Sequence, residues 1–283
     1  MKHRFKCGRF DLDLGPNCRP LVMGILNVTP DSFSDGGKFD HLDRALSHAE
    51  EMLTAGVDII DIGGESSRPG APPVPLEQEL ARVMPVLYAL RDCGKPISID
   101  TYKPQVMRAA LDAGADFIND IKGFRESTAL AAVKESDCGL CIMHMQCDPT
   151  TMQRDPHYEH IVDEVAGFLL QRVQAMEGVG IERGRMCIDP GFGFGKTQEH
   201  NFRLLHELGI FKMLERPILV GLSRKSTVYK TLGTTADKAL NGTTVMNTIA
   251  LLNGASILRV HDVQEAKEAI AIVEAYKKAS PVE

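Results

Sequence analysis

Short apolar runs recur along the chain, and each is followed by a loop and then by an amphipathic stretch. The eight runs are Leu21–Leu26, Val57–Ile60, Pro96–Ile99, Asp116–Ile118, Leu140–Met143, Met186–Ile188, Ile218–Val220 and Ser256–Leu258. They are rich in Ile and Val, and most are bounded by Gly, Pro, Asp or Asn. Continuous runs of this length are typical of parallel strands that are buried on both faces.

The segments between these runs show helical spacing. In the first, apolar residues repeat at Leu42, Ala45, Leu46, Ala49 and Leu53, with charged residues on the opposite face. The same pattern recurs in Leu80–Leu87, Val162–Met176 and Val263–Val273. Pro104 falls where the first turn of a further helix tolerates proline. The pattern therefore predicts helices that alternate with the strands.

Eight strands alternating with eight helices predict an α/β fold, a (β/α)8 TIM barrel. Residues 2–14 alternate with a period of two and predict a short β-hairpin that closes the barrel bottom. No change of composition marks a linker, so we expect a single domain over 1–283, with the hairpin in 1–16 and the barrel in 17–283. A doubly wound open sheet is the alternative, because strand count alone does not show closure.

Charge and cysteine usage narrow the class of protein. The net charge is −6 and the pI about 5.9, which argues against a nucleic-acid or membrane partner. Seven scattered cysteines are typical of a reducing compartment. No apolar stretch approaches the ~18 residues of a membrane helix, and the N-terminus lacks the apolar run of a secretory signal. We expect a cytoplasmic protein.

Cys138 and Cys141, with Cys147 nearby, have a spacing that could serve zinc or a redox pair. Leu140–Met143 is an expected strand, however, and residues three apart on a strand point to opposite faces. The sequence therefore favours cysteines that are buried for structural reasons.

Every expected strand ends at a polar residue. These residues are Asn27, Asp61, Asp100, Asn119, His144, Asp189, Ser223 and Arg259. A barrel gathers such ends at one mouth, where the active sites of this fold lie. A single polar residue there can serve as a cap or turn, but eight of eight indicate a binding site.

Two kinds of chemistry are expected at this mouth. Asp100, Asp189 and Asn119 can accept hydrogen bonds from a flat heterocycle that carries N–H donors. Asn27 and the cationic side chains near the last strands suit a phosphorylated group and its metal. The cationic side chains are Lys225, Arg259 and His261.

Six loops at the expected strand ends carry specific motifs. They are Met23–Gly37, Asp61–Gly70, Met143–Gln146, Asp189–Lys196, Ser223–Ser226 and Arg259–Asp262. With these motifs in this order, the chain resembles the dihydropteroate synthase family of folate biosynthesis, from about Leu21 to Ala275. The resemblance implies a transferase that joins 6-hydroxymethyl-7,8-dihydropterin diphosphate to 4-aminobenzoate and releases 7,8-dihydropteroate and pyrophosphate. It also implies Mg²⁺, a homodimer and competitive inhibition by sulfonamides.

The resemblance also implies roles for residues. The pterin positions are Asp100, Asn119, Asp189, Lys225, Met143, Phe194 and Gly221. The aminobenzoate positions are Ser67, Pro69, Ser223 and Phe33. Arg68, Arg259 and His261 match pyrophosphate contacts, and Asn27 matches the Mg²⁺ position. Asp100 and Lys225 are the expected catalytic residues, and no protein nucleophile is needed.

Some residues depart from the family pattern, and others are expected to have structural roles or to lie on the surface. Ser67 stands where Thr is usual, Tyr102 where Ser is usual and Cys147 where Gly is usual. We expect Asp61 to brace neighbouring loops and His144 to be a hydrogen-bonded barrel residue. His157 and His160 are expected on the surface, and Lys196 is expected to interact with solvent alone.

Three rival functions remain open. Gly195, Lys196 and Thr197 look like the end of a phosphate-binding nucleotide loop, but the first glycine of that motif falls on Pro190, which has no N–H. A pterin-binding module that feeds a methyl-transfer partner would explain the carboxylates but not Arg68, Arg259 and His261. A purely structural barrel gives no reason for polar strand ends.

Overall fold

In the computed structural model, eight strands form one parallel sheet. The structure describes residues 4–15, 18–29, 38–66, 68 and 70–279. The strand order is β8-β7-β6-β5-β4-β3-β10-β9. A parallel bridge joins Ile188 to Ile218, and the Ile188 amide donates to the Pro217 carbonyl at 3.0 Å. The two edges of the sheet therefore meet, so the predicted TIM barrel is confirmed and the open-sheet alternative is wrong.

The strands lie where the apolar runs predict them, within two residues at most ends. They are β3 Leu21–Asn27, β4 Ile59–Gly63, β5 Ile97–Asp100, β6 Phe117–Asp120, β7 Gly139–Met143, β8 Met186–Asp189, β9 Leu219–Val220 and β10 Ile257–Val260. All of β4 to β8 is buried, as continuous runs of Ile and Val require. Arg259 lies inside β10 rather than after its end, because the strand extends to Val260.

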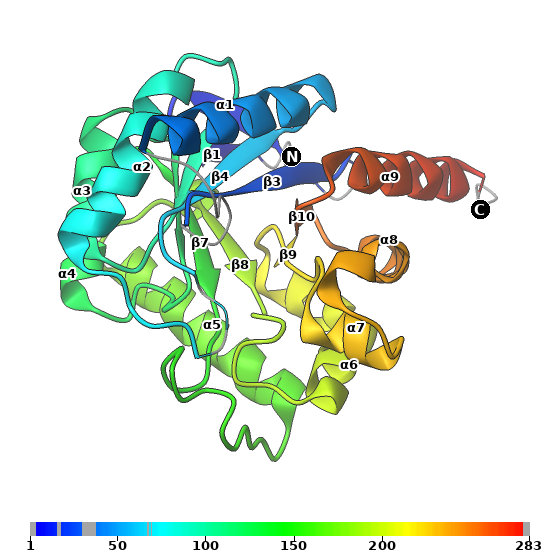
Figure 1. Cartoon of the computed structure of the whole chain (residues 1–283). Coiled ribbons are helices and arrows are strands. Elements are labelled where there is room, and N and C mark those ends of the chain that lie inside the picture. Colours follow the sequence, from blue (N-terminus) through cyan, green and yellow to red (C-terminus); the bar gives the residue numbers. More distant parts are fainter. Residues whose placement is uncertain (1–3, 16–17, 30–37, 67, 69, 280–283) are drawn as a thin grey trace.

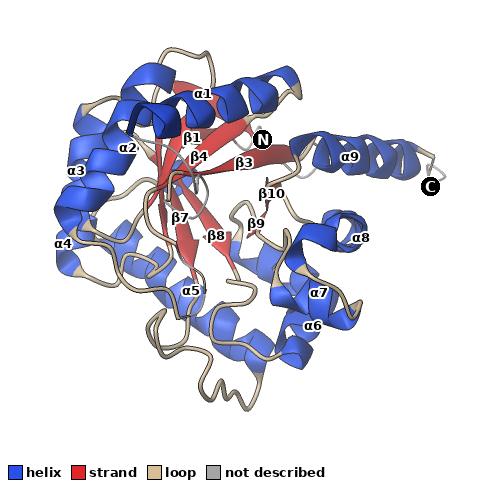
Figure 2. Ribbon diagram, in the orientation of Figure 1, coloured by secondary structure: helices blue, strands red, loops and turns tan. Residues whose placement is uncertain are grey.

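Helices cover the outside of the strands (Figures 1 and 2). They are α1 Lys38–Thr54, α2 Leu76–Leu90, α3 Pro104–Asp112, α4 Ser127–Val133, α5 Ile161–Gly178, α6 Gln198–His206, α7 Ser226–Thr231, α8 Leu240–Asn253 and α9 Val263–Lys278. Shorter 3-10 turns lie at Arg183–Arg185, Leu208–Leu214 and Ala236–Lys238. Pro104 occupies the first turn of α3, as predicted.

An antiparallel hairpin of β1 (Arg4–Cys7) and β2 (Phe10–Asp13) lies at one end of the barrel. Phe5 is 1% exposed and its ring lies 5.7 Å from that of Phe117 near the start of β6. The N-terminal ends of several strands join the same apolar cluster. The hairpin therefore fills the bottom of the barrel, as its alternating pattern predicts, and leaves the mouth at the opposite end.

The cysteines among the described residues are reduced thiols, and four of them are buried. Cys141 packs with Cys7 and Cys187 in the bottom cluster, whereas the Cys138 thiol lies 3.1 Å from the Ser136 hydroxyl. Within the described ranges, no three His, Cys, Asp or Glu residues are grouped so that they could hold a metal. No helix in those ranges is long and apolar enough to cross a membrane.

Candidate active site

The sheet register places several of the predicted residues in one row around the barrel mouth. Asn27 is paired with Gly63, Gly63 with Asp100, and Asp100 with Asn119. A cavity of about 1090 Å³ opens beside this row. Its lining includes Asn27, Arg68, Phe194, Gly221, Ser223, Lys225, Arg259 and His261. The structure thus brings residues from both ends of the chain to one site.

Arg259 joins two buried carboxylates beside this cavity. Its Nε donates to Asp61 Oδ2 at 2.6 Å and its Nη2 donates to Asp100 Oδ2 at 2.7 Å. Asp61 also accepts from the Ser98 hydroxyl at 2.5 Å and from Asn119 Nδ2 at 3.4 Å. Asp61 therefore braces neighbouring strands rather than the loops expected from the sequence, while Arg259 lines the cavity.

The pKa of the Asp100 carboxyl lies close to neutral pH. Burial raises the pKa of Asp100 to about 7, although Arg259 pulls the pKa down. Asp61 adds to the increase because the two carboxylates share one guanidinium. A carboxyl whose pKa lies so near neutrality is typical of a functional group rather than a simple ion pair.

Asn119 presents an unused acceptor. Its Nδ2 donates to Asp61, but its Oδ1 is buried and has no hydrogen-bond partner among the described residues. A buried carbonyl oxygen left unpaired costs about 1–3 kcal/mol. Such a cost is recovered when a ligand donates an N–H, so Asn119 Oδ1 indicates a ligand with N–H groups.

Asp189 and Lys225 form a second charged pair across the mouth. Asp189 is 4% exposed, and its Oδ1 accepts the Gly191 amide at 2.7 Å. Burial raises the pKa of Asp189, and the Lys225 ammonium opposes this increase. Burial lowers the pKa of Lys225 to about 8, and Asp189 opposes that decrease. The pair offers an acceptor and a donor in a region of low polarity.

Two further residues shape this region. The Lys225 Nζ lies 4.7 Å from the centre of the Phe194 ring and donates to the Phe192 carbonyl at 2.6 Å. A Cβ on Gly221 would stand 3.7 Å from Lys225 Nζ and 3.9 Å from Arg259 Cβ. Gly221 therefore lines the cavity next to the two cationic side chains, and a side chain there would take up part of that space.

Lys196 is buried, whereas the sequence analysis expects it to be exposed to solvent. It is 3% exposed, and its Nζ lies 2.9 Å from His144 Nδ1 and 3.0 Å from the Phe194 carbonyl. Burial lowers the pKa of Lys196 well below its ordinary value. The prediction is wrong because the glycine-rich loop folds back over the end of β7. His144 is a buried, hydrogen-bonded residue, as expected.

This loop also argues against nucleotide binding. The Gly191 amide donates to Asp189 and the Gly193 amide donates to Asn201 Oδ1 at 2.7 Å. A phosphate-binding loop needs such amides and its lysine free to meet a phosphate. Here two amides and Lys196 already have partners within the protein.

His261 and Ser223 form a neutral donor–acceptor pair. The His261 amide donates to Ser223 Oγ at 3.2 Å, and the hydroxyl lies 3.0 Å from His261 Nδ1. Burial lowers the pKa of His261 to about 4, and Arg259 adds to the decrease. The imidazole is therefore neutral at pH 7. In the tautomer whose Nδ1 accepts from Ser223, the ring proton lies on Nε2, where it can meet a ligand oxygen.

The backbone between Ser223 and Lys225 is strained. Arg224 has a φ of 54°, a value that costs residues other than glycine about 1–3 kcal/mol. Its guanidinium donates to both carboxylate oxygens of Asp262, at 2.6 and 3.0 Å. Sequence reasoning assigned no role to this pair, although both residues stand next to predicted site residues.

The remaining predicted residues fall into three groups. Met143 is buried and packs with Phe194 in a small apolar cluster, whereas Arg68 is exposed at the rim. Phe33, Ser67 and Pro69 lie outside the described residues. His157 and His160 are exposed at the start of α5, as expected.

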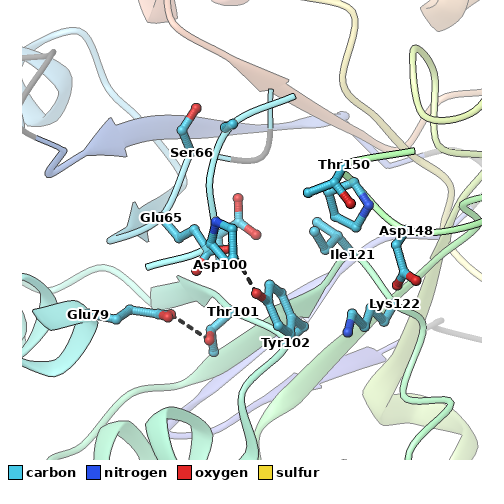
Figure 3. A pocket seen from close by; sticks show the side chains of 13 residues that line it. Glu65, Ser66, Glu79, Asp100, Thr101, Tyr102, Ile121, Lys122, Asp148 and Thr150 are labelled. Atoms are coloured by element: carbon cyan, nitrogen blue, oxygen red, sulfur yellow. Dashed lines mark hydrogen bonds between the residues drawn. The ribbon is translucent and has the colours of Figure 1, made fainter. Parts of the chain in front are cut away.

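A second cavity of about 170 Å³ was not anticipated from the sequence (Figure 3). Asp100 lines it together with Glu65, Glu79, Tyr102 and Lys122. Asp100 therefore contributes to this cavity while its partner Arg259 lines the larger one.

A closed barrel with charged and amide groups at its mouth defines an enzyme of the TIM-barrel class. Residues 23–261 match the family described as pterin binding enzyme. The chain is 47% identical to Escherichia coli (strain K12) dihydropteroate synthase over 257 residues, which covers 90% of this chain and 91% of that protein. The chain therefore belongs to the dihydropteroate synthase family of pterin-binding enzymes.

Two solved structures of the same family resemble the whole chain. Yersinia pestis dihydropteroate synthase, in a complex with a sulfonamide drug, aligns with a TM-score of 0.91 at 44% identity, over 98% of this chain and 100% of that one. Burkholderia cenocepacia dihydropteroate synthase, in a complex with 7,8-dihydropteroate, aligns with a TM-score of 0.88 at 45% identity, over 98% and 97%.

Proposed function

We propose that the chain joins 6-hydroxymethyl-7,8-dihydropterin diphosphate to 4-aminobenzoate and releases 7,8-dihydropteroate and pyrophosphate. The observation that carries the proposal is a set of buried acceptors opposite a lysine at the barrel mouth. Asn119 Oδ1 has no partner in the described chain, and Asp189 lies across from Lys225. The dihydropteroate complex of the Burkholderia cenocepacia relative supports this assignment.

The pterin ring fits the space that Gly221 leaves open. Asp189 Oδ1 already accepts the Gly191 amide, so its other oxygen can accept from the 2-amino and ring N–H edge. Asn119 Oδ1 can accept a further N–H, and Lys225 can donate to a ring acceptor. Charge-assisted hydrogen bonds of this kind contribute roughly 1.5–3 kcal/mol each. Met143 and Phe194 supply apolar walls beside the ring.

The diphosphate half of the substrate meets cationic and neutral donors. Arg259 uses Nε and Nη2 within the protein, and its Nη1 can donate to a diphosphate oxygen. His261 is neutral and can donate through Nε2, while Arg68 approaches from the exposed rim. These donors stabilise the negative charge that grows on the departing pyrophosphate.

Mg²⁺ is the cofactor that this reaction implies, and Asn27 is the residue that would hold it. An amide oxygen is a ligand that Mg²⁺ accepts, and the ion commonly takes most other ligands from substrate phosphates and water. Asn27 Oδ1 lies 3.4 Å from the position of a Cβ on Gly63, within the row that contains Asp100. When bound, the ion supplies positive charge that stabilises the leaving diphosphate.

The chemical step is a displacement at the exocyclic carbon of the pterin. The C–O bond breaks and its electron pair leaves with pyrophosphate. The aniline nitrogen forms the new C–N bond and then loses one proton. Asp100 supports the positive charge that develops on the carbon, and Lys225 holds the ring in place. We assign Ser223 to the aminobenzoate, and Phe33, Ser67 and Pro69 stay predictions for the same subsite.

The test is an assay of both products with purified protein, Mg²⁺, pterin diphosphate and 4-aminobenzoate. We expect pyrophosphate and dihydropteroate in equal amounts, and neither product when aminobenzoate is omitted. Pyrophosphate alone would mean that the acceptor is wrong. If neither product forms while reduced folates still bind, the methyl-transfer module becomes the better assignment.

We further propose a homodimer, inhibition by sulfonamides and a cytoplasmic location. The Yersinia pestis relative in its sulfonamide complex supports the inhibitor class. Apolar side chains on the outer faces of α8 and α9 support the dimer, since Val245, Ile249, Leu252, Ile272 and Tyr276 are each 39–69% exposed. The scattered free cysteines support the location.

A further inference from the structure

The loop that joins β4 to α2 carries Arg68 and is closed at its neck by Glu65. Glu65 Oε2 accepts the Val74 amide at 2.9 Å, so one side chain links the two ends of the loop. At the same neck, Arg82 donates to the Gly64 carbonyl at 2.9 Å. A Cβ on Gly64 would stand 2.7 Å from a Val83 methyl, which shows how closely α2 approaches.

Residues from a different loop hold Glu65 in turn. The Tyr102 hydroxyl donates to Glu65 Oε1 at 2.9 Å (Figure 3). Lys103 Nζ donates to Glu65 Oε2 at 2.5 Å. Lys103 also donates to Glu79 on α2. These contacts join the loop after β5 to the neck of the loop that carries Arg68. They border the smaller cavity, which Tyr102 and Glu65 both line.

The orientation of Tyr102 is fixed by its surroundings. Its ring lies between two ammonium groups, 4.6 Å from Lys103 Nζ and 4.3 Å from Lys122 Nζ. Burial, together with the hydrogen bond to Glu65, raises the pKa of Tyr102 to about 12. The hydroxyl therefore remains a donor to Glu65 at neutral pH.

We propose that Tyr102 is a positioning residue that sets how the Arg68 loop meets the diphosphate of the substrate. Tyr102 holds Glu65, Glu65 holds the neck of the loop, and the neck directs Arg68 toward the mouth cavity, which Arg68 also lines. This inference rests on the proposed function, because it needs a substrate that carries a diphosphate. Tyr102 does not touch the pterin ring in this account.

The diagnostic variant is Tyr102→Phe, which keeps the ring between the two lysines and removes only the hydroxyl. We expect affinity for the pterin diphosphate to fall about three- to tenfold, within the range for losing one ordinary hydrogen bond, because Tyr102 acts on the diphosphate only through Glu65 and Arg68. Affinity for 6-hydroxymethyl-7,8-dihydropterin, which has no diphosphate, should stay unchanged. The kcat should fall as well, but by no more than the same factor, because Arg68 also stabilises the departing pyrophosphate.

Glu65→Gln tests the same contact from its other side. If Tyr102 acts through Glu65, the two substitutions should not add. A protein that carries both Tyr102→Phe and Glu65→Gln should then bind the pterin diphosphate as tightly as whichever single variant has the lower affinity. Amide hydrogen exchange at Val74, whose N–H donates to Glu65, should quicken in both single variants. Tyr88→Phe is the control, since Tyr88 is 54% exposed on α2 and should alter neither binding nor exchange.

The outcomes separate this inference from the proposed function. An active wild-type protein in which Tyr102→Phe changes neither diphosphate affinity nor loop exchange overturns the role of Tyr102 alone. An equal loss of affinity for the ligand without a diphosphate also overturns it, because Tyr102 would then act on the pterin. A wild-type protein that forms neither product refutes the proposed function, while the exchange measurement still tests the contact with Glu65.

Discussion

Asp100 and Lys225 illustrate how burial adjusts single residues for chemistry near neutral pH. Both are charged side chains at the barrel mouth, and burial moves their pKa values toward each other, to about 7 and about 8. Arg259 supports the Asp100 carboxylate, and Asp189 supports the Lys225 ammonium. The form with both charges present is therefore most populated in a narrow pH range.

The pH dependence of kcat/KM follows from these two groups. Below a pH of about 7, Asp100 gains a proton and loses the charge that supports the reacting carbon. Above a pH of about 8, Lys225 loses a proton, and its neutral amine is a weaker hydrogen-bond donor to the pterin ring than the ammonium. We predict a bell-shaped profile for the pterin diphosphate. Lys225→Arg should remove the alkaline limb, and a profile unaltered by Lys225→Arg would contradict the assignment.

Asp100→Asn tests the catalytic role more directly. The substitution keeps the shape of the side chain but removes its negative charge. We predict a fall in kcat of about a hundredfold or more, the scale for losing one group that stabilises a transition state. The KM for aminobenzoate should change much less. Unchanged kinetics in steady-state assays would remove Asp100 from the mechanism.

Arg224 and Asp262 affect the site through the backbone. We predict that Arg224→Gly keeps the melting temperature nearly unchanged, because glycine adopts a φ of 54° without strain. The kcat/KM should still fall about tenfold, since Ser223 and Lys225 lose their fixed spacing. Asp262→Asn should cause a similar fall. Full activity in Asp262→Asn combined with an inactive Arg224→Gly would show that Arg224 touches substrate itself.

Among the elements, the strands were the most predictable from sequence. A strand such as β7 is buried on both faces, so its apolar run has no polar interruption and its bounds can be read within two residues. Lys196 was not predictable, because its burial depends on how three glycines turn the loop after β8 toward His144. The contact between Tyr102 and Glu65 joins two loops and leaves no signal at any fixed spacing.

The N-terminal hairpin gives a prediction about stability. Phe5 fills the barrel bottom against Phe117, and a Cβ on Gly139 would stand 2.9 Å from its ring. We predict that Phe5→Ala lowers the free energy of unfolding by about 3–5 kcal/mol. Activity per folded molecule should persist, because the mouth is at the opposite end. Chemical denaturation measures the first effect, and a loss below about 1 kcal/mol would contradict the packing role.

At the scale of the whole molecule, the fold and the order of the polar strand ends were predictable. Strand count alone left an open sheet as the alternative, and the structure decides for the barrel through the bridge between Ile188 and Ile218. The register that aligns Asn27, Asp100 and Asn119 in a row also comes from barrel geometry rather than from sequence spacing.

The exposed apolar side chains on α8 and α9 allow a test of the proposed dimer. Ile249 is 39% exposed on α8, and α8 packs beside α9, which carries the 69% exposed Ile272. We predict that Ile249→Asp shifts the protein from dimer to monomer in sedimentation equilibrium. Tyr88→Asp, on α2 at the opposite side of the barrel in Figure 1, should remain dimeric. A monomeric wild-type protein would contradict the proposal.

Pterin binding at the barrel mouth depends, in our proposal, on the Asp189 carboxylate. The most direct measurement is calorimetric titration of 6-hydroxymethyl-7,8-dihydropterin into the wild-type protein, Asp189→Asn and the control Asp92→Asn, whose side chain is 80% exposed. We predict wild-type affinity in the control and a loss of about a hundredfold in Asp189→Asn, because an amide N–H then faces the ring donors. Equal affinity in all three proteins would contradict it.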